Sequence, residues 1–309
     1  MTRPDPSARP DVHADITRSI LADLACGVRP WTRPWSDGGL GVRPLRHDGQ
    51  PYHGINVLLL WSRASIQAYD QPVWMTFRQA LALGGCVRRG EAGTPVIYAG
   101  RSNTDREEPE HATPSNAETG AESGPARRRG GAFLKRYTVF NLAQIDGLEG
   151  RYPAPEPRPL PARIDRAEQV FAAVGAEIRH GGTQAFYNPG ADVVHMPHPG
   201  RFAEIEAYYA VLGHELTHWT GHPRRLARDL HLSRFGDTAY AREELIAELG
   251  AAFLCADLGL SLEPRPDHAA YLAAWLRVLG DDPRFIVSAA AHAERAVALL
   301  HGLAAVPDA

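Results

Sequence analysis

Three residues in the second half of the chain have the types and spacing of a metal-dependent catalytic site. They are His214, Glu215 and His218, in the segment HELTH. Apolar residues at helical spacing around them predict a helix over residues 203–221. Residues four apart share a helix face, so both imidazoles can bind one metal ion while Glu215 lies beside a bound water. The spacing predicts a metallopeptidase-type site, with two histidine ligands and Glu215 as the catalytic base.

A site of this kind needs a third protein ligand, and a later segment with a helical pattern supplies carboxylates. Glu244 and Glu248 are four residues apart in the segment EELIAE and share a face, whereas Glu243 is expected to point elsewhere. We predict Glu244 as the third ligand and Glu248 as an acceptor that orients a histidine ring. These ligands suit zinc (Zn2+), and Mn2+ or Fe2+ are the alternatives that such a set also binds.

The first half of the chain combines aromatic and basic residues. Without residues 102–126, residues 1–150 contain 17 Arg or Lys against 10 Asp or Glu, although the whole chain has a net charge of −3. Rings that stack on bases, interleaved with arginines that contact phosphate, are typical of a surface for single-stranded nucleic acid. Tryptophan is more often a core residue, so a core role stays open. The candidate DNA-binding residues are Trp31, Trp35, Tyr52, Asn56, Trp74, Arg78, Arg88, Arg89, Lys135 and Arg136.

Length and composition limit the class of protein. A chain of 309 residues suits two domains of ordinary size, each able to bury its own core. Its 44% hydrophobic and 22% charged residues are typical of soluble proteins, and no apolar run is long enough to span a membrane. The N-terminus lacks an apolar signal segment and the three cysteines are unclustered, which favours the cytoplasm over export.

Two segments divide the chain. Residues 102–131 are polar and rich in Gly and Pro, without hydrophobic periodicity, which predicts a disordered insertion. Residues 149–162 have a proline at nearly every other position, which predicts an extended connector. We therefore expect one domain over residues 1–150, a linker over 151–162 and a second domain over 163–309.

The expected elements make the protein α+β. In the first half we predict helices at 13–26, from 56 onward and at 77–83, with strands at 95–99 and 137–142 that can pair as a hairpin. The second half is predicted to be mainly helical with a small antiparallel sheet. Its helices are expected at 163–174, 203–221, 239–259, 267–279 and 283–302, and its strands at 185–187 and 192–196.

The order of these motifs resembles the ArdC-type antirestriction proteins of conjugative plasmids and their relatives. In the first half the resemblance rests on the segments PW at 30–31 and 34–35, YHGIN at 52–56, WMTFRQA at 74–80, GGCVRRGE at 84–91 and TVFNLAQI at 138–145. In the second half it rests on HELTHWTGH at 214–222 and EELIAE at 243–248. It implies an N-terminal single-stranded-DNA-binding domain, a C-terminal zincin-like metallopeptidase domain, and protection of incoming DNA from restriction nucleases.

The resemblance also bears on the site residues and leaves the reaction open. The E-x-x-A-E arrangement is similar to that of thermolysin-like enzymes, which supports Glu244 as a ligand and Glu248 as its neighbour that orients a histidine. A metallopeptidase scaffold can bind metal without cleaving a substrate. The alternatives are an active endopeptidase whose first half recognises a protein substrate or a restriction enzyme, and a DNA-binding protein with a purely structural metal. The oligomeric state is not predicted.

Overall fold

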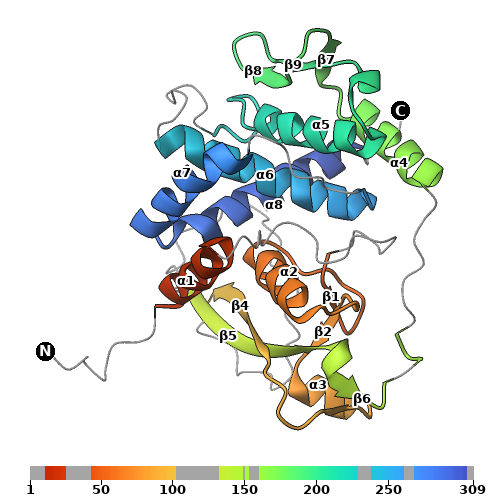
Figure 1. Cartoon of the computed structure of the whole chain (residues 1–309), viewed down its shortest axis with the longest axis vertical. Helices are drawn as coiled ribbons and strands as arrows, with labels where there is room; N and C mark the ends of the chain where they lie inside the picture. Colours follow the sequence, from red (N-terminus) through yellow and green to blue (C-terminus); the bar gives the residue numbers. More distant parts are fainter. Residues whose placement is uncertain are drawn as a thin grey trace, which may run out of the picture.

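Two groups of elements face each other in the computed structural model, one mainly helical and one arranged around a four-stranded sheet (Figure 1). The structure describes residues 11–25, 43–101, 132–148, 150–152, 160–228, 238–260 and 268–304. The predicted insertion at 102–131 and most of the predicted linker lie outside the described residues, as do Trp31 and Trp35.

The first half is built on a sheet with the strand order β1-β2-β5-β4. Strands β4 and β5 are antiparallel neighbours, with Thr94 opposite Val139 at one end and Arg101 opposite Ala132 at the other, so the predicted hairpin is confirmed. A second pair, β3 with β6, is antiparallel. The elements are α1 (Val12–Ala25), β1 (Leu45–Arg46), α2 (Ile55–Gln67), β2 (Val73–Met75), α3 (Phe77–Ala82), β3 (Cys86–Val87), β4 (Thr94–Arg101), β5 (Ala132–Asn141), η1 (Leu142–Gln144) and β6 (Ile145–Asp146).

The second half is mainly helical, as predicted, and carries a three-stranded sheet with the order β7-β9-β8. The two predicted strands, β8 and β9, are antiparallel, and β7 adds a parallel strand that the sequence analysis missed. Its sequence EIRH has no apolar alternation to mark a strand. The elements are α4 (Leu160–Ala173), β7 (Glu177–His180), β8 (Phe186–Asn188), β9 (Val193–Met196), η2 (Pro199–Arg201), α5 (Ile205–Thr220), α6 (Thr238–Leu258), α7 (His268–Asp281) and α8 (Phe285–Ala304).

Apolar side chains of the two halves form one continuous core. Helix α1 contacts α7, and α2 contacts α8, which places them side by side in Figure 1. The ring of Trp61 on α2 lies 6.1 Å from that of Phe253 on α6, and both side chains are buried. The two halves therefore share this core, because the amphipathic faces of α1 and α2 pack on the helices of the second half, while a smaller separate cluster around Met75 and Ile145 lies within the first half.

A buried ionic cluster joins the halves beside this core. The guanidinium of Arg43 donates to both carboxylate oxygens of Asp257 on α6, at 2.6 and 2.9 Å, and to Glu294 on α8 at 2.7 Å. Glu294 also accepts from the backbone N–H of Gly54 at 3.0 Å and lies 2.9 Å from His53 Nδ1. Helix α6 is thereby fixed to the first half at its C-terminal end.

None of the helices among the described residues combines the length and apolar character needed to cross a membrane.

Candidate metal centre

Helices α5 and α6 bring the predicted metal ligands together by packing closely. Gly250 on α6 lies against Thr217 on α5, and a Cβ at position 250 would come within 2.5 Å of the Thr217 side chain. Thr217 bonds to the carbonyl of Gly213 at 2.8 Å, which holds its side chain along its own helix. Because Gly250 has no side chain, α5 and α6 can approach each other closely beside the histidines.

The structure brings His214, His218 and Glu244 to one point. The two Nε2 atoms lie 3.1 Å apart, and each lies 3.5 Å from a carboxylate oxygen of Glu244. Tetrahedral ligands at zinc bond lengths of about 2.0–2.2 Å are separated by roughly 3.3–3.6 Å. Two imidazole nitrogens and a carboxylate at this spacing fit a divalent cation.

A carboxylate faces the other ring nitrogen of each histidine. Glu248 Oε1 lies 3.4 Å from His214 Nδ1, where an orienting acceptor was predicted, and the two atoms are within ion-pair range without forming a hydrogen bond. Glu243 Oε1 lies 3.2 Å from His218 Nδ1, so the expectation that Glu243 points elsewhere is wrong. Glu243 and Glu244 are adjacent on α6 and lie on either side of the line along which α6 contacts α5. Their carboxylates therefore reach the two ring nitrogens of His218 from different sides. Both rings are thereby turned with Nε2 toward Glu244.

Arg228, which the sequence analysis did not identify, fixes Glu243 in place. Its guanidinium is buried and donates to Glu243 at 2.8 Å, to Thr220 Oγ1 at 2.9 Å and to the Thr217 carbonyl at 2.6 Å. These partners are the buried Thr217 carbonyl and Thr220 hydroxyl near the C-terminal end of α5, as well as the carboxylate. Arg228, Glu243 and His218 therefore form a buried chain that ends at the metal ligands.

The carboxylates control the protonation of the histidines. Burial lowers the pKa of His218, but its contacts with Glu243 and Glu244 outweigh burial and raise that pKa to about 10. For Glu244, burial raises the pKa, and the hydrogen bonds to His214 and His218 more than offset it and lower the pKa well below its usual range. A cation that binds His218 must therefore displace a proton.

Glu215, the predicted base, is buried next to His214 on α5, with 3% of its surface exposed. Within the described part of the chain its carboxylate has no hydrogen bond or ion pair. Its oxygens are free to accept a proton from a molecule that enters the site.

A polar cluster ties the small sheet to the end of α5. Arg225 donates to the Asp192 carboxylate and to the Trp219 carbonyl at 2.7 Å, and its guanidinium lies 3.7 Å from the centre of the Trp219 ring. Tyr187 Oη donates to Asp192 at 2.8 Å. The hydrogen bond from Arg225 is the main reason that the pKa of Asp192 falls to about 2. The β8–β9 turn is thereby held beside the helix that carries the histidines.

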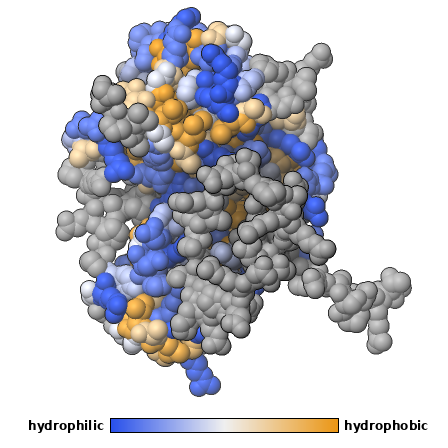
Figure 2. Space-filling view, turned by 180° about the vertical axis from the view of Figure 1, so that it is seen from behind, coloured by the Kyte–Doolittle hydropathy of each residue, from blue (hydrophilic) through white to orange (hydrophobic). Residues whose placement is uncertain are grey.

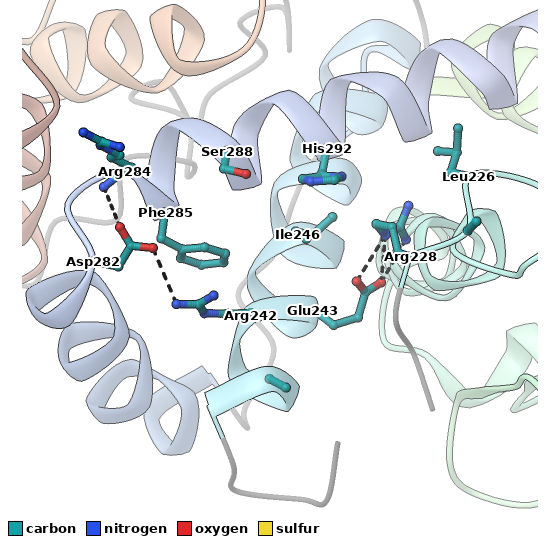
Figure 3. A pocket seen from close by; sticks show the side chains of 12 residues that line it. Leu226, Arg228, Arg242, Glu243, Ile246, Asp282, Arg284, Phe285, Ser288 and His292 are labelled. Atoms are coloured by element: carbon teal, nitrogen blue, oxygen red, sulfur yellow. Dashed lines mark hydrogen bonds and ion pairs between the residues drawn. The ribbon is translucent and has the colours of Figure 1, made fainter. Parts of the chain in front are cut away.

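A pocket of 570 Å³ opens on the side of α6 that carries Arg242 and Glu243 (Figure 3). The Arg228–Glu243 ion pair lies at one end of it, and Arg242, which pairs with Asp282 at 3.5 Å, lies at the other. Phe285 and His292 lie between these pairs on α8 (Figure 3). The pocket therefore borders the residues that support His218 and not the metal ligands.

In the first half, three of the candidate DNA-binding residues have structural roles. Tyr52 and Trp74 are buried, with 7% and 1% of their surfaces exposed, so their rings cannot stack on bases and those two predictions are wrong. Asn56 exchanges two hydrogen bonds of 2.8 Å with the backbone of Ile97, which joins α2 to β4. That a residue is aromatic does not show whether its side chain is exposed, and the rings of Tyr52 and Trp74 contribute more to stability in the core.

The basic candidates are all exposed. Arg78 and Arg89 have no hydrogen bond or ion pair among the residues that the structure describes. Arg88 donates hydrogen bonds to Glu91, to Asp146 and to the carbonyl of Ala143. The two remaining candidates, Lys135 and Arg136, lie on β5, where Arg136 is 4.0 Å from Asp15.

Comparison with known families matches each half of the chain. A model described as the N-terminal domain of anti-restriction factor ArdC matches residues 10–140, and one described as a zincin-like metallopeptidase matches residues 165–292. Together they account for both groups of elements in Figure 1.

Relatives and solved structures match nearly the whole chain. The uncharacterized protein y4eC of Sinorhizobium fredii is 41% identical over 96% of this chain and 93% of its own length. The DNA primase TraC of Escherichia coli is 40% identical over 92% of this chain, which spans only 26% of that primase. Crystal structures of antirestriction protein ArdC from the R388 plasmid, metal-free and Mn(II)-bound, are 40% identical over 96% of this chain, with TM-scores of 0.75 and 0.77, and are themselves covered over 98% and 100%.

Proposed function

Because the chain belongs to the ArdC family of antirestriction proteins, we propose that it binds single-stranded DNA, holds zinc at a peptidase-type site and protects incoming DNA from restriction. The Mn(II)-bound structure of the R388 relative supports a divalent cation, and Mn2+ is the alternative occupant. The convergence of two imidazole nitrogens and one carboxylate on a single point carries the metal part of the proposal.

Each residue of the site has a role in this proposal. His214, His218 and Glu244 hold the cation, which when bound acts as a Lewis acid toward a carbonyl and lowers the pKa of water. Glu215 accepts a proton from the attacking water and later delivers it to the leaving amine. Glu243 and Glu248 fix the two rings so that Nε2 faces the cation.

Charge and exposure support the assignment of single-stranded DNA binding to the first half. Arg78, Arg88, Arg89, Lys135 and Arg136 all face solvent. Exposed cations that contact phosphate make affinity fall as salt rises. The match to the ArdC N-terminal domain supports the same assignment.

Metal content of the purified protein tests the site. We expect one equivalent of zinc in the parent protein, loss of the metal in His214→Ala and Glu244→Ala, and full retention in His222→Ala. His222 is the matched control because it continues the four-residue spacing of the histidines but lies beyond the end of α5. Zinc retained without Glu244 would remove that residue from the ligand set.

A Glu215→Gln variant separates a catalytic site from a structural one. The partnerless carboxylate of Glu215 favours catalysis, since a structural site would have no use for it. We expect the variant to keep its zinc and to lose cleavage of a protein substrate. If the variant protects incoming plasmid DNA in a restricting host as well as the parent does, protection requires DNA binding alone and not proteolysis.

A further inference from the structure

The short helix α3 exposes large apolar side chains. Phe77 and Leu81 have 48% and 51% of their surfaces exposed, and they share one face of the helix because they are four residues apart. Ala80 is the residue of α3 that is buried against the core. Figure 2 shows a hydrophobic area at the lower end of the molecule, the end at which α3 and β6 lie in Figure 1. Folding does not require a phenylalanine or a leucine at these exposed positions.

A second aromatic ring, partly buried against the core, adjoins this surface from the sheet. Phe140 on β5 lies with its ring centre 6.4 Å from that of Phe77, at an angle of 65°. A Cβ at position 93 would lie 3.0 Å from the Phe140 ring and 2.3 Å from the Thr138 side chain. The glycine therefore provides the space in which the Phe140 ring leans toward α3. An edge-to-face pair of this kind leaves a face of the exposed ring open to a further stacking partner.

An unpaired arginine borders the exposed ring. Arg78 follows Phe77 directly, is exposed, and has no ionic partner in the described residues. Arg136 lies on the same face of β5 as Phe140, because side chains alternate between the two faces of a strand, and it is 4.0 Å from the carboxylate of Asp15. Glu91 and Asp146 both bond to Arg88, which offsets one of their two negative charges.

We propose that Phe77 and Phe140 form a base-stacking platform for single-stranded DNA, with Arg78 and Arg136 as phosphate contacts. This inference rests on the proposed DNA binding and locates it. An exposed aromatic ring bordered by cations, here Phe77 supported by the partly buried Phe140, is the chemistry that binds single strands without sequence preference. A purely apolar protein partner would not require an unpaired arginine, Arg78, at the edge of the surface.

The first test measures the affinity of the full chain for a fluorescent oligodeoxythymidine by anisotropy at several salt concentrations. Phe77→Ala is expected to weaken binding by about 5- to 150-fold, the range observed for loss of one stacked base. The slope of log affinity against log salt should stay unchanged, because no charge is removed. Phe77→Tyr should restore most of the affinity, since a tyrosine ring also stacks.

The second test uses charge. Arg78→Ala is expected to weaken binding and to reduce the magnitude of the salt slope by about 0.7, the value for one phosphate contact with a single strand. Phe186→Ala is the matched control, because Phe186 on β8 is a similarly exposed phenylalanine, at 45%, in the other half of the chain. It should bind as the parent does. Thermal unfolding of each variant shows that the fold is kept.

Three outcomes would overturn the platform, and they are distinguishable. Salt-sensitive binding by the parent that Phe77→Ala and Arg78→Ala leave unchanged would keep DNA binding and place it elsewhere. No binding by the parent would remove the proposed DNA function together with the platform. A change from dimer to monomer on Phe77→Ala, measured by sedimentation, would instead make this surface a contact between two copies of the chain.

Discussion

The arginines of the two halves differ in what surrounds them, and this difference separates the two sites. Arg228 is buried against Glu243 and the end of α5, and its pair with Glu243 supports His218, one of the candidate metal ligands. Arg78 is exposed and has no partner among the described residues. A buried arginine specifies the geometry of a site, whereas an exposed one is available to a ligand.

The same contrast applies to the whole of each site. The metal centre consists of few atoms whose positions are fixed by two packed helices and by carboxylates behind the ligands. The surface around Phe77 consists of exposed side chains: Phe77 and Leu81 are about half exposed, and Phe77 contacts the ring of Phe140. We therefore expect substitutions in buried networks to change stability and metal affinity, and substitutions on the surface to change DNA affinity alone.

The largest expected effect concerns the buried ionic cluster between the halves. Arg43→Ala leaves Asp257 and Glu294 without their main partner, and should lower the free energy of unfolding by about 3–5 kcal/mol. Urea denaturation measures this change. The control is Arg18→Ala, whose exposed pair with Asp15 is expected to contribute less than about 1 kcal/mol. Equal effects of the two substitutions would contradict the contrast between buried and exposed arginines.

The next effect concerns the support of His218. Glu243→Gln keeps the shape of the side chain but removes the charge that faces His218 Nδ1 and Arg228, and should weaken zinc binding by about 10- to 100-fold. Competition with a fluorescent chelator measures the affinity. Glu177→Gln, in an exposed pair with Arg179, should leave it unchanged. Unchanged zinc affinity in Glu243→Gln would show that Glu243 interacts with Arg228 but does not support His218.

The dependence of zinc affinity on pH tests the same cluster without a substitution. The contacts with Glu243 and Glu244 raise the pKa of His218 to about 10, so the proton-bound form is favoured below that pH and the cation competes better as pH rises. Affinity should therefore increase about tenfold per pH unit for each proton released. Calorimetry in buffers of different ionisation enthalpy counts those protons. A constant affinity between about pH 6 and pH 8 would show that the carboxylates do not hold a proton on the histidines.

The sequence could predict the metal centre because its geometry is local. The spacing of His214 and His218 on one helix determines that they share a face, and the same rule places Glu244 and Glu248 together. The two pairs come together only if α5 packs on α6, and the apolar residues around each motif indicated that packing. The support by Arg228 could not be predicted, since it depends on where the chain returns after α5.

The surface of the first half was harder to predict because residue type does not decide exposure. Tyr52 and Trp74 are as suitable for stacking as Phe77, and the fold buries the first two and exposes the third. The sheet and helices of this half were predicted well enough to identify the hairpin. Burial depends on α1 and α2 packing against the second half, which is a contact between residues far apart in the chain.

The smallest expected effect sharpens the location of the DNA-binding surface. Tyr137 is 38% exposed and lies on the face of β5 opposite to Phe140, because side chains alternate along a strand. If DNA follows the face next to α3, Tyr137→Ala should leave DNA affinity within about twofold and the free energy of unfolding within about 0.5 kcal/mol. Anisotropy and urea denaturation measure the two quantities. A loss of affinity equal to that of Phe77→Ala would move the DNA to the other face of the hairpin, where Tyr98 and Lys135 lie opposite each other.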